Sequence, residues 1–310
     1  MANLGYLQVT RQCNQRCLFC SNPENDNLLR FEDAQRAVSE LRDQGCTGVI
    51  LTGGEPTLYG PLAELIAFCR DLDIAPRIIS NGQKLADPAY FDALVHAGLD
   101  HVHLSLHSCR APVQAALTGN DGSLAAIEQA LAHCGERGVS VNINTVINAV
   151  NADHLHHTVR WVMQRFPFVR HFVWNNLDPY LNRVREHPET IPALTAFEVP
   201  LALAMRDLAA AGRTFRVERV PLCYMVEYPE YSTETRKIVK SERRDIYFLD
   251  ERSRFSQDRF FYDKGPACAA CRCNAICAGL YGGDEYYALQ ALAPLFLDPE
   301  QIARRVRGAP

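Results

Sequence analysis

The chain has 310 residues, of which 47% are hydrophobic and 22% are charged, and its net charge is -4. This composition is typical of a globular protein and excludes a disordered chain, and the length allows one large domain or one domain with a smaller companion. No apolar run approaches the roughly 18 residues of a membrane span, and the net charge gives no general electrostatic reason to bind nucleic acid.

The chain begins MANLGYLQVTRQ, without the basic and apolar segments of an export signal. We therefore expect a cytoplasmic protein. The sequence contains twelve cysteines. Because the cytosol keeps structural disulfides reduced, this number indicates metal ligands or redox chemistry.

Short apolar, β-branched segments alternate with amphipathic segments of helical period over the first two thirds of the chain. Helices are expected to end near Gly45, Gly98 and Gly138, since a glycine in the left-handed conformation often stops a helix. Strands and helices in alternation favour a parallel sheet with helices outside. We predict an α/β fold, a partial (β/α)6 TIM-like barrel over residues 1–212. The six predicted strands are 5–10, 48–52, 77–80, 100–106, 139–147 and 169–174.

The pattern changes after about residue 212. Residues 235–264 are charged and aromatic, and they lead into the cysteine-rich stretch GPACAACRCNAIC at 265–277. We predict a small second domain over residues 213–310, which is too short and polar for a large core and is expected to need another source of stability. Within it, packing around the cysteines is favoured for residues 236–264 over a surface that grips an acidic peptide or stacks on RNA.

Three cysteines crowd into the sequence CNQRCLFC directly after the first predicted strand. In a barrel of this type the active site lies at the C-terminal ends of the strands. The spacing C-x3-C-x2-C suits one metal centre, yet three thiolates leave a tetrahedral zinc or one iron of a cubane short of a ligand. A missing protein ligand leaves a position open to a small molecule. A zinc knuckle with a histidine as fourth ligand is the alternative.

This triplet resembles the CxxxCxxC signature of the radical SAM superfamily, with Phe19 at the usual aromatic position. The resemblance implies that Cys13, Cys17 and Cys20 hold a [4Fe-4S] cluster, whose fourth iron is chelated by S-adenosylmethionine (AdoMet). It also implies that flavodoxin or ferredoxin reduces the cluster, which cleaves AdoMet to methionine and a 5′-deoxyadenosyl radical. That radical then takes a hydrogen atom from the substrate.

Further motifs of the family follow the next predicted strands, and the resemblance implies that they bind AdoMet. His107 departs from the family pattern, in which an aspartate is common at this place. Asn144 and Asn142 are expected to line the barrel interior, because alternate residues of a strand share a face. The implied AdoMet-binding residues are Phe19, Gly53, Gly54, Glu55 and Pro56 (similar to the GGEP motif), Ser80 and Asn81, Ser105, His107 and Asn144.

The second cysteine group resembles the C-terminal auxiliary-cluster extensions, called SPASM or twitch, of some radical SAM enzymes. The resemblance implies one auxiliary [4Fe-4S] cluster, acting as electron acceptor, with ligands Cys223, Cys268, Cys271 and Cys277. A compact set that uses Cys273 in place of Cys223 remains open, as does a structural zinc ribbon.

Other candidates carry weaker signals. Cys109 follows His107 and Ser108 near the expected active-site face and is a candidate hydrogen donor. His154, which begins a helix with two further histidines, is expected on a solvated face rather than at a metal. The residues after the sixth strand, from Asn175 to Asp178, are candidates for contact with the substrate.

Relatives with auxiliary clusters often modify peptides or mature other enzymes, so the resemblance favours peptide or protein modification. A small-molecule substrate and tRNA remain alternatives. From a different class, a non-enzymatic iron–sulfur carrier or zinc-bound module is also considered. Such a protein would not turn over AdoMet.

Overall fold

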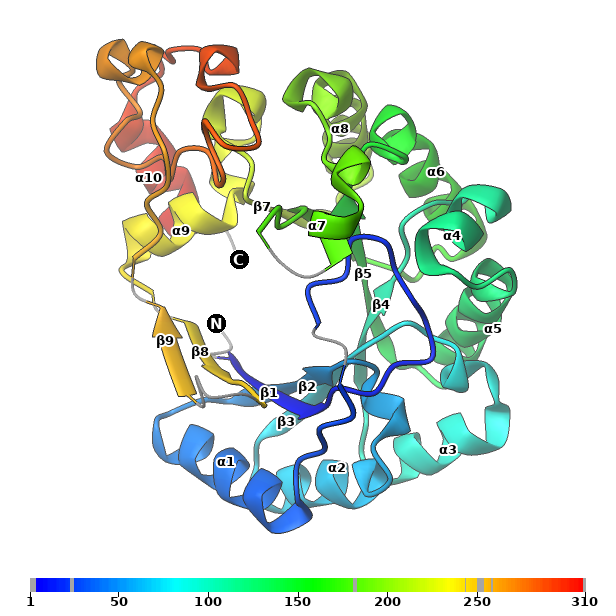
Figure 1. Cartoon of the computed structure of the whole chain (residues 1–310). Coiled ribbons are helices and arrows are strands. Elements are labelled where there is room, and N and C mark those ends of the chain that lie inside the picture. The colour runs from blue at the N-terminus through cyan, green and yellow to red at the C-terminus, as the bar shows by residue number, and fades with distance from the viewer. Residues whose placement is uncertain are drawn as a thin grey trace.

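A computed structural model describes residues 4–22, 25–180, 183–242, 244–249, 254–257 and 259–308. Within these residues the chain forms one curved nine-stranded sheet, with helices on its outer side (Figure 1). The strands are β1 (Leu4–Thr10), β2 (Gly48–Gly53), β3 (Ala75–Ser80), β4 (His101–Ser105), β5 (Ser140–Ile147), β6 (His171–Asn176), β7 (Thr214–Glu218), β8 (Arg244–Tyr247) and β9 (Arg254–Gln257).

The strand order is β7-β6-β5-β4-β3-β2-β1-β8-β9. All neighbours from β7 to β8 pair in parallel, and β9 pairs with β8 in the antiparallel direction. The two end strands are not paired with each other, so the barrel is partial, as predicted. The six predicted strands are confirmed as β1 to β6, and β7 continues the parallel sheet beyond residue 212.

The helices follow the strands as the alternating pattern predicts. Gly45, Gly98 and Gly138 have φ angles of +82°, +106° and +68°, which confirms their role in ending helices. None of the described helices has the length and apolar character that crossing a bilayer requires. The helices are α1 (Phe31–Asp43), α2 (Leu62–Asp71), α3 (Pro88–His96), α4 (Ala111–Thr118), α5 (Ser123–Glu136), α6 (Leu155–Arg165), α7 (Arg183–Glu186), α8 (Leu194–Ala210), α9 (Thr233–Lys240) and α10 (Pro299–Gly308).

The strands separate an apolar outer layer from a polar interior. On β4, Val102 and Leu104 are fully buried in the core under the helices, whereas His101 and His103 face the other way. The same alternation on β5 turns Asn142 and Asn144 into the barrel, where both line a cavity. This confirms the predicted inward direction of the two asparagines.

The C-terminal part of the chain lies beside the open edge of the sheet. The β8–β9 hairpin extends the sheet from β1, while α9 contacts β7 and α10 (Figure 1). The expectation that residues 236–264 pack around the cysteines is therefore wrong for 244–249 and 254–257. It holds for Lys264, whose Nζ donates to the carbonyl of Cys277 at 2.6 Å.

The end of β2 packs unusually closely against the segment that follows β1. The backbone N–H of Gly54 donates to the Thr10 carbonyl, and that of Glu55 donates to the Gln12 carbonyl, both at 2.7 Å. A Cβ atom on Gly54 would lie 2.1 Å from the Gln12 carbonyl oxygen, closer than real contacts allow. The glycines of the GGEP motif are therefore required by contact between two parts of the chain.

We expect Gly54→Ala to lower the free energy of unfolding by about 3 kcal/mol, because the added methyl group meets backbone that cannot move aside without strain. Gly60→Ala is the matched control, since a Cβ there meets nothing within 4 Å. Chemical denaturation of both variants measures the difference. Equal stability of the two variants would show that the packing is looser than described.

Candidate active site

The cysteine loop follows β1 and is held from outside by the end of α4. The backbone N–H of Arg16 donates to the carbonyl of Thr118 at 2.9 Å, and that of Leu18 to the carbonyl of Leu117 at 3.0 Å. The Gln15 side-chain amide donates to Ser123 Oγ at 3.1 Å. These bonds fix the loop at the C-terminal edge of the sheet, where the sequence predicts the active site.

Cys13, Cys17 and Cys20 lie on this loop as free thiols. Burial, and after it the proximity of the other two cysteines, raises the pKa of Cys17. Burial also raises the pKa of Cys13. In the described part of the chain, no three Cys, His, Asp or Glu side chains are arranged closely enough to hold a metal ion.

The donor set nevertheless fits an iron–sulfur cluster chemically. The three thiols belong to one short loop and influence one another electrostatically, so they are neighbours. Thiolates are the ligands of iron–sulfur clusters, and cluster binding has to displace the thiol protons and draw the sulfurs together. Phe19 is the buried aromatic residue of this loop. It is 8% exposed, and its ring meets the His107 ring edge-on at 4.7 Å.

Glu55 is buried at the junction of β2 and β3. Its Oε1 accepts hydrogen bonds from the N–H and hydroxyl of Thr57 and from Ser80 Oγ, at 3.1, 2.6 and 2.8 Å, and its Oε2 accepts from the N–H of Asn81 at 2.7 Å. Burial raises the pKa of Glu55, and these hydrogen bonds oppose that shift. Pro56, also buried, begins the short helical turn that Glu55 caps.

Asn81 connects this network to the cysteine loop. Its side-chain amide donates to Asn14 Oδ1 at 2.7 Å and lies 3.9 Å from Cys13 Sγ. The structure therefore brings together Glu55, Ser80 and Asn81 with the first cysteine of the triplet. These residues lie at the ends of three different strands, and the sequence predicts them as parts of three separate motifs.

His107 is buried after β4, and burial lowers its pKa to about 4. The backbone N–H of Val146 donates to its Nδ1 at 3.3 Å, so the ring is neutral with its proton on Nε2. His107 therefore offers a hydrogen-bond donor where an aspartate would offer an acceptor. Ser105 and Asn144 are register partners on β4 and β5, next to this site.

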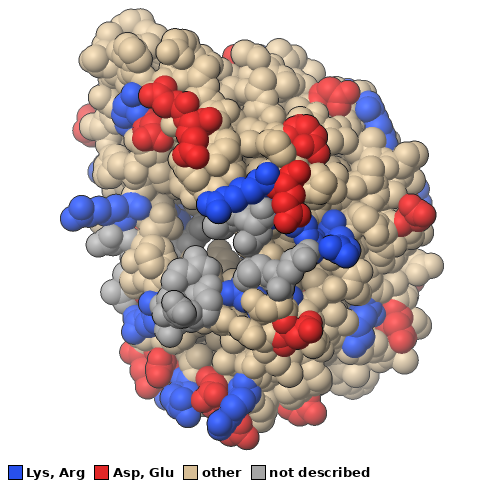
Figure 2. Space-filling model, viewed as in Figure 1, with Lys and Arg blue, Asp and Glu red and all other residues tan. Residues whose placement is uncertain are grey.

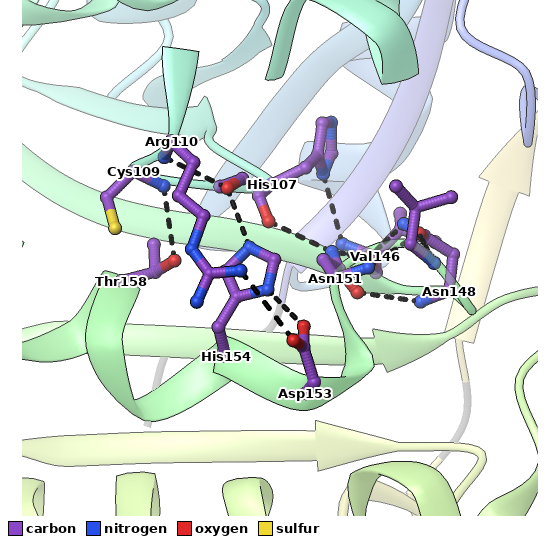
Figure 3. Close-up of polar contacts among 11 residues, drawn as sticks. His107, Cys109, Arg110, Val146, Asn148, Asn151, Asp153, His154 and Thr158 are labelled. Atoms are coloured by element: carbon purple, nitrogen blue, oxygen red, sulfur yellow. Dashed lines mark hydrogen bonds and ion pairs between the residues drawn. The ribbon is translucent and has the colours of Figure 1, made fainter. Parts of the chain in front are cut away.

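Ser108, His154 and Asp153 form a hydrogen-bonded series that resembles a hydrolytic triad (Figure 3). Ser108 Oγ lies 2.8 Å from His154 Nε2, and His154 Nδ1 contacts Asp153 Oδ1. Both Ser108 and His154 are fully buried, so no substrate reaches the hydroxyl. The series instead ties the loop after β4 to the start of α6. The expectation of a solvated His154 is wrong, because the ring packs inward as a polar bridge.

Cys109 is half-buried beside this series. Its backbone N–H donates to Thr158 Oγ1 at 3.2 Å, and its sulfur points away from His107 (Figure 3). It is not among the residues that line the two large cavities described below. A role for Cys109 as a hydrogen donor stays a prediction.

The residues after β6 connect the barrel to the C-terminal unit. Asn176 exchanges hydrogen bonds with the hydroxyl of Tyr287, and Asp178 accepts from the hydroxyl of Tyr281 at 3.3 Å. Asn175 donates to Asn144 Oδ1 at 2.7 Å inside the barrel. Asp178 lines a cavity of about 510 Å³ that also touches Gly53, while Asn175 lines a second cavity.

The second cavity fills the barrel interior and measures about 930 Å³. Its walls carry Arg77, His103, His171 and Arg216, none of which was singled out from the sequence. The alternation of side chains along each strand could have identified them, because it turns them toward the same interior as Asn142. Figure 2 shows a hollow near the centre of this face of the molecule, flanked by Lys and Arg side chains.

The C-terminal cysteines form a separate group. Cys223, Cys268, Cys271 and Cys277 line one small cavity, and Cys273 is not among its lining residues. Cys273 is fully buried, with its sulfur 3.8 Å from the Leu297 carbonyl, and burial raises its pKa to about 11. Burial also raises the pKa of Cys223 to about 11, and the proximity of Cys277 and Cys268 contributes a smaller increase.

Comparison with known proteins gives consistent results. A PqqA peptide cyclase of Methylocella silvestris is 30% identical over 150 residues, 47% of this chain and 40% of the relative. A probable GTP 3′,8-cyclase of Thermococcus kodakarensis is 35% identical over 126 residues, 39% of this chain and 40% of the relative. The matched stretch thus spans 40% of the length of each of these relatives.

Among solved structures, Streptococcus suis SuiB bound to its precursor peptide SuiA superposes with a TM-score of 0.63 at 17% identity. The match covers 90% of this chain and 72% of SuiB, and it shows a common fold. The family model of the Radical SAM superfamily matches residues 7–162, half of the chain. That stretch contains the cysteine loop, the Glu55 network and His107, so the chain belongs to the radical SAM superfamily.

Proposed function

We propose that this protein is an enzyme that reductively cleaves AdoMet and abstracts a hydrogen atom from a peptide or protein, which it thereby modifies. The observation that carries the proposal is the cysteine loop at the C-terminal edge of the partial barrel, joined through Asn81 to the Glu55 network. A [4Fe-4S] cluster held by this loop would supply the electron for cleavage of AdoMet to methionine and a 5′-deoxyadenosyl radical. We assign Cys13, Cys17 and Cys20 as its ligands.

The residues around the loop would bind and orient AdoMet. Backbone and side-chain groups of Gly53 to Pro56, with Ser80 and Asn81, lie at adjoining strand ends. We assign Phe19, Ser105, His107 and Asn144 to the same site, and Asn144 also lines the cavity in the barrel interior. Enclosing the reacting groups in the barrel excludes water, which protects a reactive radical from side reactions.

A substrate of peptide or protein nature is supported by the names of similar proteins. One relative is a PqqA peptide cyclase, and SuiB was solved with a precursor peptide. The similarity to a probable GTP 3′,8-cyclase favours a small-molecule substrate as the second candidate. Flavodoxin or ferredoxin is the proposed reductant, and the cytoplasm the proposed compartment.

An auxiliary [4Fe-4S] cluster, accepting the substrate electron, is the proposed role of the C-terminal cysteines. Its proposed ligands are Cys223, Cys268, Cys271 and Cys277, which share one cavity. Cys273 is a less suitable ligand, because its sulfur is buried in an apolar cluster with Leu222, Leu295, Ile302 and Val306. A zinc ion on the same cysteines is the alternative.

The proposal is tested by counting iron and sulfide in protein reconstituted without oxygen. We expect about eight irons in the wild type and about four in the variant with Cys13→Ala, Cys17→Ala and Cys20→Ala together. Only the wild type should release 5′-deoxyadenosine from AdoMet after reduction. A wild type that binds iron at this loop but never cleaves AdoMet would instead be a non-enzymatic carrier.

The auxiliary ligand set is tested by comparing Cys277→Ala with Cys273→Ala. We expect Cys277→Ala to lose about four irons and Cys273→Ala to keep all of them, because Cys277 lines the shared cavity and Cys273 does not. Zinc is measured in the same samples. Loss of iron from Cys273→Ala would favour the compact ligand set, and one zinc in place of four irons would exclude the auxiliary cluster.

The role of Glu55 is tested by calorimetric titration of AdoMet. We expect Glu55→Ala to weaken AdoMet binding by about tenfold with the iron content unchanged, because four donors at the strand ends lose their acceptor. Glu64→Ala, which removes an exposed carboxylate from α2, is the matched control. Unchanged AdoMet affinity in Glu55→Ala would remove Glu55 from the proposed AdoMet site.

A further inference from the structure

The floor of the barrel interior is polar and basic. The cavity of about 930 Å³ is bounded by the inward faces of β1 to β7 and by α9. Its described lining contains five Lys or Arg residues but only two carboxylates, Glu218 and Glu242. The basic residues are Arg77, Arg216, Arg219, Arg236 and Lys237.

Most of these charges have partners. Arg236 forms an ion pair with Glu242 at 3.1 Å, and Arg219 forms one with Asp178 at 3.5 Å. Arg216 lies over the ring of Tyr231. Burial lowers the pKa of Arg216, and the nearby charge of Arg236 lowers it further. Among the described lining residues, positive charges therefore outnumber negative ones.

Arg77 stands apart from this set. It is half-buried, and its Nε is fully enclosed without a hydrogen-bond partner among the described residues. Asp100, the carboxylate that most affects it, is already paired with Arg70 at 2.5 Å. Burial lowers the pKa of Arg77, and the opposing effects of Asp100 and Tyr6 are smaller. Enclosing the Nε–H of a guanidinium without an acceptor is costly, and an anion in the cavity would offset that cost.

Neutral hydrogen-bond donors lie next to Arg77. His101 is its register partner, and the next row runs from His103 through Asn142 to His171. The Asn142 amide donates to His103 Nδ1 at 3.4 Å, so the His103 proton lies on Nε2, which has no acceptor among the described residues. Burial lowers the pKa of His101 and His171 to about 4, so these rings add no charge of their own.

We propose that the barrel floor binds an anionic oxygen group, a carboxylate or a phosphate, with Arg77 as its charge partner and the His103 row as neutral donors. This inference rests on the proposed function. It states that the substrate carries an acidic group, which would be held deeper in the barrel than the reacting carbon. Arg77 precedes Ser80 by three residues, so the anion would lie about 10 Å deeper than the proposed AdoMet site. An acidic residue of a peptide and a free small anion share this chemistry.

The test is equilibrium binding to the full-length, cluster-reconstituted protein, measured by calorimetry. The probes are inorganic phosphate, N-acetylglutamate amide and, as the neutral counterpart, N-acetylglutamine amide. We expect at least one anionic probe to bind, the glutamine probe to bind at least tenfold more weakly, and Arg77→Met to lose at least tenfold in affinity. Arg77→Lys should recover part of the lost affinity, because lysine restores the positive charge but not the two parallel N–H donors of the guanidinium.

Arg36→Met is the matched control, since it removes an exposed arginine from α1 and should leave anion binding unchanged. Preference for the glutamate probe identifies an acidic residue as the source, and preference for phosphate identifies a free anion. Failure of the wild type to bind either anion, or equal binding by Arg77→Met with unchanged thermal unfolding, would overturn the proposal. Release of 5′-deoxyadenosine from AdoMet, measured in parallel, reports on the proposed function separately, because that cleavage does not require the barrel floor.

Discussion

The buried carboxylate of Glu55 is the contact on which the geometry of the site depends. It accepts hydrogen bonds from Thr57 on its own turn and from Ser80 and Asn81 on the neighbouring strand end. Parallel strands otherwise leave their C-terminal ends with unpaired groups, and a single buried acceptor satisfies several of them at once. The ends of β2 and β3 are thereby held in one fixed arrangement.

Asn81 links Glu55 to the cysteine loop, because its side-chain amide donates a hydrogen bond to Asn14 Oδ1. The loop is held a second time from the opposite side, where Arg16 and Leu18 bond the end of α4. Two independent attachments keep a short segment in place although its thiols have no bonds to one another. Such preorganisation reduces the conformational entropy that cluster binding has to overcome.

The apolar alternation of the strands was enough to predict β1 to β6, and three glycines correctly predicted the ends of helices. The β8–β9 hairpin was missed because its residues, such as Asp245 and Ser256, are polar and pair at the edge of the sheet rather than in its core. His154 was predicted on a solvated face from its polar neighbours. Its burial depends on Ser108, which is distant in sequence and adjacent only in the fold.

The motifs for the cofactor could be found locally because each lies within a few residues of one strand end. The basic floor could not, because its members come one or two at a time from β3 to β7 and from α9. Arg77 looks like an ordinary charged residue in the sequence, and only the curved sheet encloses its Nε without a hydrogen-bond partner among the described residues. The amides of Asn144 and Asn175 lie between Arg77 and the cysteine loop, level with Glu218 on β7. Because Arg77 lies deeper on β3 than Ser80 and Asn81, an elongated substrate with one acidic end would enter with that end toward Arg77.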